Sequence, residues 1–226
     1  MQLQSTLKTS NSISFFTQFK SRYLFLLVCL FLVFLSFVSQ TFILTEDIFF
    51  NLLGEQMAYE KVQELIDNQQ KWQWVGYLTI PLIYFLKLSL LSLSLMIGVV
   101  FLGVKLNFKQ LFRVALLAEF VMLIPAFLKT AWFIFIDTEY TFEEVSYFMP
   151  LSLSNLFEAG ELPIYWAYPL QIANAFELVY WFVLAYLIGK LLQSNTAEGF
   201  KVVLYGYLPS LLLWVLLVIF LYVNMG

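Results

Sequence analysis

The sequence predicts an all-α fold, a polytopic integral membrane helix bundle with five transmembrane helices. Three observations lead to it: the composition, the length of the apolar runs, and the sorting of basic and acidic residues between loops. Hydrophobic residues make up 62% of the chain and charged residues 12%, whereas soluble domains have roughly 45–50% and 25%. A chain with 25 Phe, 13 Tyr and 6 Trp would aggregate in water, so its solvent must be the lipid bilayer.

The apolar runs divide the chain into a short tail and one membrane domain. Most of the 226 residues fall in these runs, so no room is left for a separate soluble domain. We expect a cytoplasmic basic tail over 1–22 and a single five-span domain over 23–226. The expected spans cover about 23–43, 75–104, 114–136, 169–188 and 202–223.

The first apolar run follows a polar tail made basic by Lys8, Lys20 and Arg22. A cleaved signal peptide also has a basic start, but its apolar core is only ~7–15 residues long and ends in a small-x-small site. Here the run is longer, and Phe37 and Val38 stand where small residues would be needed. We therefore interpret the run as a retained span, with a removed signal peptide as the alternative.

The first loop, 45–74, predicts an amphipathic helix. Its apolar residues recur at helical spacing: Phe49, Leu52, Leu53, Tyr59, Val62 and Ile66. Because the loop is acidic, we expect this helix to pack on the bundle rather than on anionic lipid. Trp72, Trp74 and Tyr77 are typical of an interfacial belt, and Pro81 in the next span can break or kink its helix. Small residues give that span surfaces for close helix contact: Ser89, Ser92, Ser94, Gly98 and Gly103.

The central span separates basic residues at one end from acidic residues at the other. Over 114–136 it contains two charged residues, Glu119 and Lys129. This length crosses a bilayer core of ~30 Å at ~1.5 Å per residue. Pro125 lies between the two charges, and we expect it to kink the helix and free a backbone carbonyl.

The second loop, 137–168, holds six acidic residues and no basic residue. Within it, Tyr147–Phe157 mixes aromatic residues with Ser, Asn and Pro, as a segment in the headgroup region does. We expect amphipathic helical segments in both of these loops. The fourth span is unusually polar at its outer end, where Gln171, Asn174 and Glu177 lie three apart along one broad face.

The distribution of charge predicts the orientation of the chain. With the N-terminus inside, eight of the 12 Lys and Arg residues fall on the inner side. Basic residues concentrate in cytoplasmic loops, so the five spans run from an inner N-terminus to an outer C-terminus. The eight inner residues are Lys8, Lys20, Arg22, Lys105, Lys109, Arg113, Lys190 and Lys201.

Four charged residues remain inside spans, namely Lys87, Glu119, Lys129 and Glu177. An ionised group at the bilayer centre costs at least ~2.5–3.5 kcal/mol. Counting the helical rise from the inner basic residues places Glu177 level with both lysines, and Glu119 nearer the inner interface. Three interpretations stay open: a buried Lys–Glu pair between two helices, a proton or ion relay (or substrate counter-ion), and contact with another subunit.

Composition also limits the chemistry. Histidine is absent and Cys29 is the single cysteine. This excludes an intrachain disulfide, a thiolate cluster, His-dependent nucleophilic catalysis and the usual zinc sites. We therefore expect no catalytic residue, no cofactor and no metal. The pI near 5.0 leaves no basic face for nucleic acid.

A motif near the C-terminus resembles a known family. The stretch LYGYLPSLLLWVLL, with Gly206, Tyr207 and Pro209, is similar to the Gly-Tyr-x-x-Pro stretch in the spans of Yip-domain membrane proteins. Phe-Lys pairs precede each span that starts at the inner side of the membrane, at 19–20, 108–109 and 200–201, and are similar to pairs in bacterial members of that family. The resemblance implies five spans, a cytoplasmic N-terminus, and a non-enzymatic adaptor that binds other membrane proteins.

We expect a non-enzymatic scaffold, adaptor or accessory subunit of a membrane protein complex involved in trafficking, secretion or assembly. Its partners would be the lipid bilayer and other integral membrane proteins, or further copies of itself. The alternatives are a small-solute or proton-coupled transporter subunit that uses the buried Lys and Glu residues, and a His-free intramembrane enzyme. We expect the bacterial inner membrane, or a Golgi or ER membrane in a eukaryote.

Overall fold

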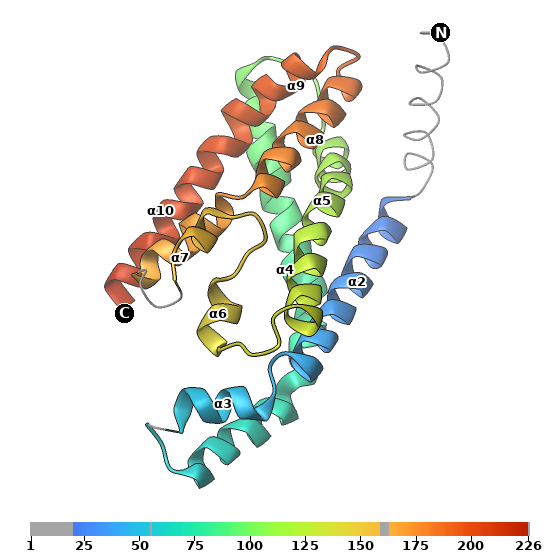
Figure 1. The fold of residues 1–226 in the computed structure, drawn as a ribbon. Coiled ribbons are helices and arrows are strands. Elements are labelled where there is room, and N and C mark those ends of the chain that lie inside the picture. Colours follow the sequence, from blue (N-terminus) through green and yellow to red (C-terminus); the bar gives the residue numbers. More distant parts are fainter. Residues whose placement is uncertain (1–19, 55, 159–162, 226) are drawn as a thin grey trace, which may run out of the picture.

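The computed structural model describes residues 20–54, 56–158 and 163–225, and these ranges are predominantly helical. Almost all of the expected tail, 1–22, therefore lies outside the described residues. The longest helices lie along one another in a bundle (Figure 1). They are α2 (Ser21–Phe42), α4 (Tyr59–Phe101), α5 (Phe108–Phe135), α8 (Ala175–Leu191) and α10 (Leu208–Met225).

Four long helices are apolar enough to cross a membrane. They are α2, α4, α5 and the continuous helix Thr196–Asn224, which joins α9 (Thr196–Val202), η2 (Val203–Tyr207) and α10. The prediction of an all-α chain with several helices long and apolar enough to cross a membrane is confirmed. The fourth expected span corresponds to α8, which has 17 residues and a length of about 25 Å. Five spans and their orientation remain predictions.

Helix α4 is longer than the sequence pattern predicts. The first loop contains the short helix α3 (Glu46–Leu53), and α4 then runs 43 residues without a break at Pro81. This length is about 65 Å, so part of α4 extends beyond a hydrocarbon core of ~30 Å. Val62 and Ile66, in this extension, are buried. The expected amphipathic helix is therefore divided between α3 and the first turns of α4, which pack on each other.

The expected polar face of the fourth span is interrupted. Helix α7 (Ile164–Ile172) ends before Asn174, and α8 begins after it. Asn174 is the N-cap of α8, where its side-chain oxygen accepts a hydrogen bond from the N–H of Glu177 at 2.8 Å. Asparagine favours this capping position over a helix interior. Gln171, Asn174 and Glu177 therefore do not share one continuous helical face.

Glycines allow the last helix to cross its neighbours closely. A Cβ on Gly206 would collide with the backbone of α4 at Ser94, and a Cβ on Gly98 would collide with the carbonyl of Val202. The same holds at the α8–α9 crossing, where a Cβ on Gly199 would meet the Ala185 carbonyl. Segment η2 is a π-helix at the first of these crossings. Such wider turns occur mostly as single insertions in α-helices, frequently at functional sites.

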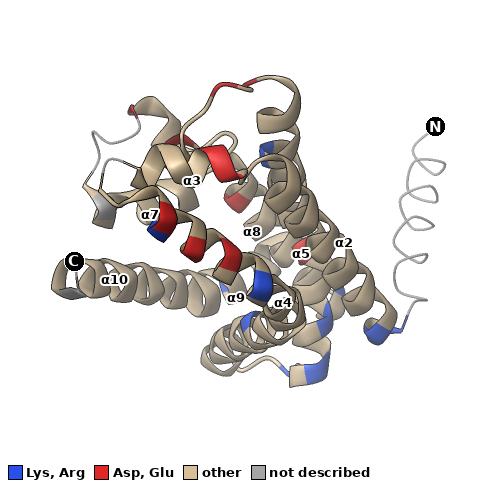
Figure 2. Ribbon diagram, turned by 90° about the horizontal axis from the view of Figure 1, so that it is seen from below, with Lys and Arg blue, Asp and Glu red and all other residues tan. Residues whose placement is uncertain are grey.

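The charged loops gather at opposite ends of the bundle. Acidic residues lie on α3, on the start of α4 and in the loop after α5, at the end from which Figure 2 is viewed. The α4–α5 turn and the α8–α9 turn lie at the other end (Figure 1). Five basic residues lie in the first turn or on the helices that flank the two turns: Lys105, Lys109, Arg113, Lys190 and Lys201. We name these the acidic end and the basic end.

A folded loop covers part of the acidic end. Residues 137–158, which we name the acidic ledge, contain α6 (Phe142–Tyr147) and the 3₁₀ turn η1 (Leu153–Leu156). A capping box between Thr141 and Glu144 starts α6. The side chain of Gln171 donates to the Ser146 and Tyr147 carbonyls, at 2.7 and 3.0 Å. The ledge is therefore attached to α7.

Candidate functional site

An ion pair joins helices α4 and α5 within the bundle. The ammonium of Lys87 on α4 contacts Oε1 of Glu119 on α5. Glu119 is completely buried, whereas 47% of the Lys87 side chain is exposed on the isolated chain. The ammonium also lies 5.0 Å from the centre of the Tyr84 ring, which adds a cation–π contact. The pair thus connects the surface of α4 with the interior of the bundle.

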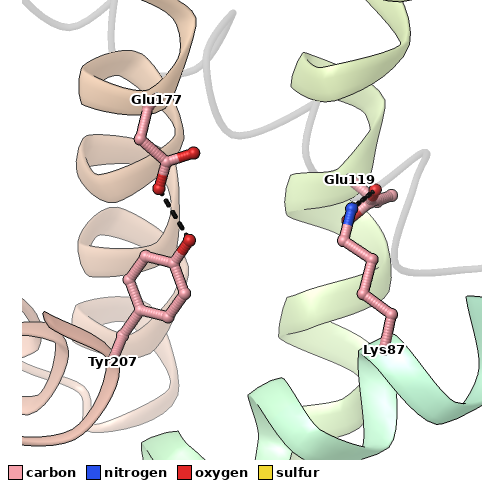
Figure 3. A network of polar contacts seen from close by, with 4 residues as sticks. All are labelled: Lys87, Glu119, Glu177 and Tyr207. Atoms are coloured by element: carbon pink, nitrogen blue, oxygen red, sulfur yellow. Dashed lines mark hydrogen bonds and ion pairs between the residues drawn. The ribbon is translucent and has the colours of Figure 1, made fainter. Parts of the chain in front are cut away.

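The second buried carboxylate is held by neutral donors. Glu177 is 8% exposed, and its Oε1 accepts from the Tyr207 hydroxyl at 2.6 Å and from the Trp181 indole N–H at 2.7 Å. Tyr207 is the last residue of the π-helix, so the widened turn supplies a donor to α8. Figure 3 shows the carboxylates of Glu177 and Glu119 on separate helices, with Tyr207 and Lys87 as their respective partners.

The two carboxylates belong to one electrostatic cluster. The Lys87 ammonium and the Glu119 carboxylate both act on Glu177 through space. Tyr180 is coupled to both carboxylates and is 2% exposed, and its ring meets the Tyr207 ring edge-on with centroids 5.9 Å apart. We name Tyr84, Lys87, Glu119, Glu177, Tyr180 and Tyr207 the buried cluster.

Two buried polar atoms in this cluster make no hydrogen bond to the part of the chain that the structure describes. They are Oε2 of Glu119 and the hydroxyl of Tyr180. Buried polar atoms usually have a partner in the protein or an ordered water. Oε2 of Glu119 can accept a hydrogen bond, and the Tyr180 hydroxyl can donate one. The site is therefore polar, enclosed and incompletely satisfied by the protein.

The structure separates Lys129 from the other three charges that the sequence places inside spans. Within the described ranges its ammonium forms no ion pair and no hydrogen bond. Lys87, which the sequence offers as a partner for Glu177, pairs directly with Glu119 instead. The remaining members of the predicted polar face, Gln171 and Asn174, hold the acidic ledge and the start of α8.

The sequence reasoning did not identify the aromatic members of the cluster as site residues. Tyr207 belongs to the Gly206-Tyr207-Leu208-Pro209 stretch, but its contact with Glu177 depends on the π-turn. Tyr84 and Tyr180 stand in apolar runs with nothing to distinguish them from the other tyrosines. A tyrosine three residues from a charged residue, such as Tyr84–Lys87 or Glu177–Tyr180, is one signal that could have been used.

The cluster offers proton donors and acceptors and one cation. Carboxylates, phenols and an ammonium can hold or relay a proton or bind a small cation. Groups of three or more His, Cys, Asp or Glu side chains placed to bind a metal ion do not occur among the described residues.

Comparisons with protein-family models, with curated proteins and with solved structures give no match. The likeness to Yip-domain proteins accordingly remains a prediction.

Proposed function

We propose that the chain is a non-enzymatic accessory subunit or scaffold of a membrane protein complex, and that the acidic ledge is its contact surface. The observation that carries this proposal is Leu151, which has a backbone φ of +54° and a side chain 68% exposed. A leucine in this left-handed region costs roughly 1–3 kcal/mol and persists only where its surroundings enforce it. A solvated connector has no need of such a conformation.

The enforcing contacts come from the break between α7 and α8. The carbonyl of Leu151 accepts from the N–H of Ala175 at 3.1 Å, and the N–H of Leu153 donates to the Ala173 carbonyl at 3.0 Å. These bonds form an isolated antiparallel bridge between Ser152 and Asn174. The bridge fixes an exposed leucine at the acidic end.

The acidic ledge carries further exposed apolar side chains and several acidic ones. Leu153, Leu156 and Phe157 are 48–76% exposed, and a cavity of about 550 Å³ lies beside them. Its lining includes Asp137, Glu143, Glu144, Phe157 and Glu158. An ordered, exposed loop with apolar side chains within an acidic surface is suited to a partner that offers a basic rim around an apolar patch. As the membrane of this complex we propose the inner membrane of a bacterium, or a Golgi or ER membrane in a eukaryote.

Site-specific photocrosslinking in living cells tests the proposal. A photoreactive amino acid at Leu156 should give a discrete adduct with one membrane protein, and charge reversal by Glu143→Lys should reduce its yield. The same probe at Ser194, at the basic end, is the matched control and should give no such adduct. Adducts with lipid alone at Leu156 would contradict the proposal.

A transporter or permease subunit for a small solute or for proton-coupled transport is the second candidate. The interruption between α7 and α8, with Glu177 in the first turn of α8, favours it because discontinuous helices form the substrate and ion sites of many transporters. Proteoliposomes under a pH gradient should then take up protons or solute, and Glu177→Gln should abolish uptake without changing reconstitution yield. Equal uptake by empty liposomes would exclude this candidate.

A further inference from the structure

The buried cluster contains more negative than positive charge. Lys87 supplies one positive charge, while Glu119 and Glu177 each supply one negative charge when ionised. The direct pair of Lys87 and Glu119 is neutral, which leaves the charge of Glu177 without a cationic partner. Tyr207 and Trp181 donate hydrogen bonds to Glu177 but bring no net charge.

The position of the cluster makes this imbalance unfavourable. Glu119 is completely buried and Glu177 is 8% exposed, so water does not solvate either carboxylate freely. Both lie on helices packed against each other within the bundle. An ionised group in such surroundings is usually paired, neutralised by a proton, or accompanied by a small cation.

The unsatisfied atoms indicate where the missing positive charge can be held. Oε2 of Glu119 is buried without a donor, and the Tyr180 hydroxyl is buried without an acceptor. The Trp181 and Tyr207 hydrogen bonds to the Glu177 side chain both go to Oε1, which leaves its Oε2 for a proton. The titratable groups coupled to these carboxylates are Tyr84 and Lys87 on α4, Tyr180 on α8 and Tyr207 on η2. Cys29 on α2 and Tyr168 on α7 are coupled only to Tyr84 and to Tyr207, respectively.

We propose that the buried cluster holds one exchangeable proton at neutral pH, carried by the carboxylate of Glu177 while Glu119 is paired with Lys87. The proton makes the cluster of Lys87, Glu119 and Glu177 electrically neutral. Removal of either carboxylate also makes the cluster neutral, because one ammonium and one carboxylate remain. The proton should therefore depend on both glutamates, unlike a proton bound by a single isolated side chain. This proposal concerns whether the cluster binds a proton, and it holds for both of the functions considered above.

Infrared spectroscopy of the full chain in lipid nanodiscs at neutral pH tests the proposal. The wild-type protein should show the carbonyl band of a protonated carboxylic acid, and this band should shift in D₂O. The band should be lost in Glu177→Gln and equally in Glu119→Gln. Glu198→Gln is the matched control, since Glu198 lies at the surface in an ion pair with Lys201, and it should retain the band.

Lys87→Met gives the opposite expectation. Without the ammonium, the cluster needs a second proton for neutrality, so the intensity of the band should roughly double. If a glutamine variant does not fold, the doubled band of Lys87→Met assigns the band to the cluster, and an unchanged band in Lys87→Met overturns the proposal. Absence of the band in the wild type overturns the proposal. This includes the outcome in which the band is absent and sodium ions stabilise the protein, because a bound cation would then neutralise the cluster instead of a proton. A wild-type band that survives either glutamate substitution also overturns it.

Discussion

At the scale of single residues, two lysines inside spans have different surroundings and should respond differently to replacement. Lys87→Met leaves the buried carboxylate of Glu119 without its partner, and breaking such a pair from one side costs about 3–5 kcal/mol. Lys129→Met removes an ammonium that has no ion pair within the described ranges, so stability should be unchanged or higher. Thermal unfolding in mild detergent compares the two variants. Equal losses would show that Lys129 has a partner of its own.

Tyr207 is the residue through which the π-turn acts on the cluster. Tyr207→Phe removes the 2.6 Å hydrogen bond to Glu177 while keeping the ring. Such a bond contributes about 0.5–1.5 kcal/mol when the carboxyl group is protonated and about 1.5–3 kcal/mol when it is ionised. We expect a corresponding loss of stability against heat or denaturant. Tyr205→Phe is the matched control on the same turn, because Tyr205 is 52% exposed. A similar effect of both changes would argue against a specific role for the Tyr207 hydroxyl.

At the scale of helices, glycines determine how closely α4 and the last helix approach. Gly98→Ala places a methyl group against the Val202 carbonyl, and the helices must separate to accept it; overpacking of this kind costs about 1–3 kcal/mol. Gly76→Ala, in the same helix, meets nothing within 4 Å and should stabilise by up to about 1 kcal/mol. Unfolding of both variants measures the difference. Opposite signs are expected, and a neutral Gly98→Ala would contradict the close crossing.

Tyr140 attaches the acidic ledge to the end of α2. Its hydroxyl donates to the Ile43 carbonyl at 3.2 Å, and burial, with a smaller effect of the Asp137 carboxylate, raises its pKa. Because the folded state retains the proton, this contribution is complete below the unfolded pKa of about 10 and is lost as pH rises through the folded value. The stability difference between wild type and Tyr140→Phe should therefore shrink above about pH 10. A difference independent of pH up to about 11 would refute the assignment.

The sequence predicts the long helices but not their level relative to one another. Depths counted from Lys105 and Arg113 place Lys87 far from Glu119, because Arg113 is already inside α5 while Lys105 precedes it. Counted from the actual helix ends, Lys87 is 14 residues before Phe101 and Glu119 is 11 residues after Phe108. These counts correspond to about 21 and 17 Å. A lysine side chain bridges that small difference, so the pair forms.

Local signals explain other differences between the predicted and observed elements. Pro81 was expected to break or kink its span and Pro125 to kink its own, and α4 and α5 are each one continuous helix, so neither proline breaks its helix. The kinks stay predictions. A proline removes one backbone donor, and helices in a bundle can compensate for it through packing. The break before α8 comes instead from the Asn174 cap, and its hydrogen bonds with the acidic ledge are contacts between residues distant in sequence.

At the scale of the whole molecule, the separation of the basic and acidic ends defines a test of the five-span arrangement. Single cysteines at Ser194, between α8 and α9, and at Glu139, after α5, lie at opposite ends and are both exposed. The native Cys29 is 4% exposed and should react little with an impermeant thiol reagent. If α8 crosses the membrane and the positive-inside rule holds, intact cells should label Glu139→Cys and not Ser194→Cys, while permeabilised cells should label both. Labelling of both positions in intact cells would mean that α8 does not cross, and the reverse pattern would invert the orientation of every span.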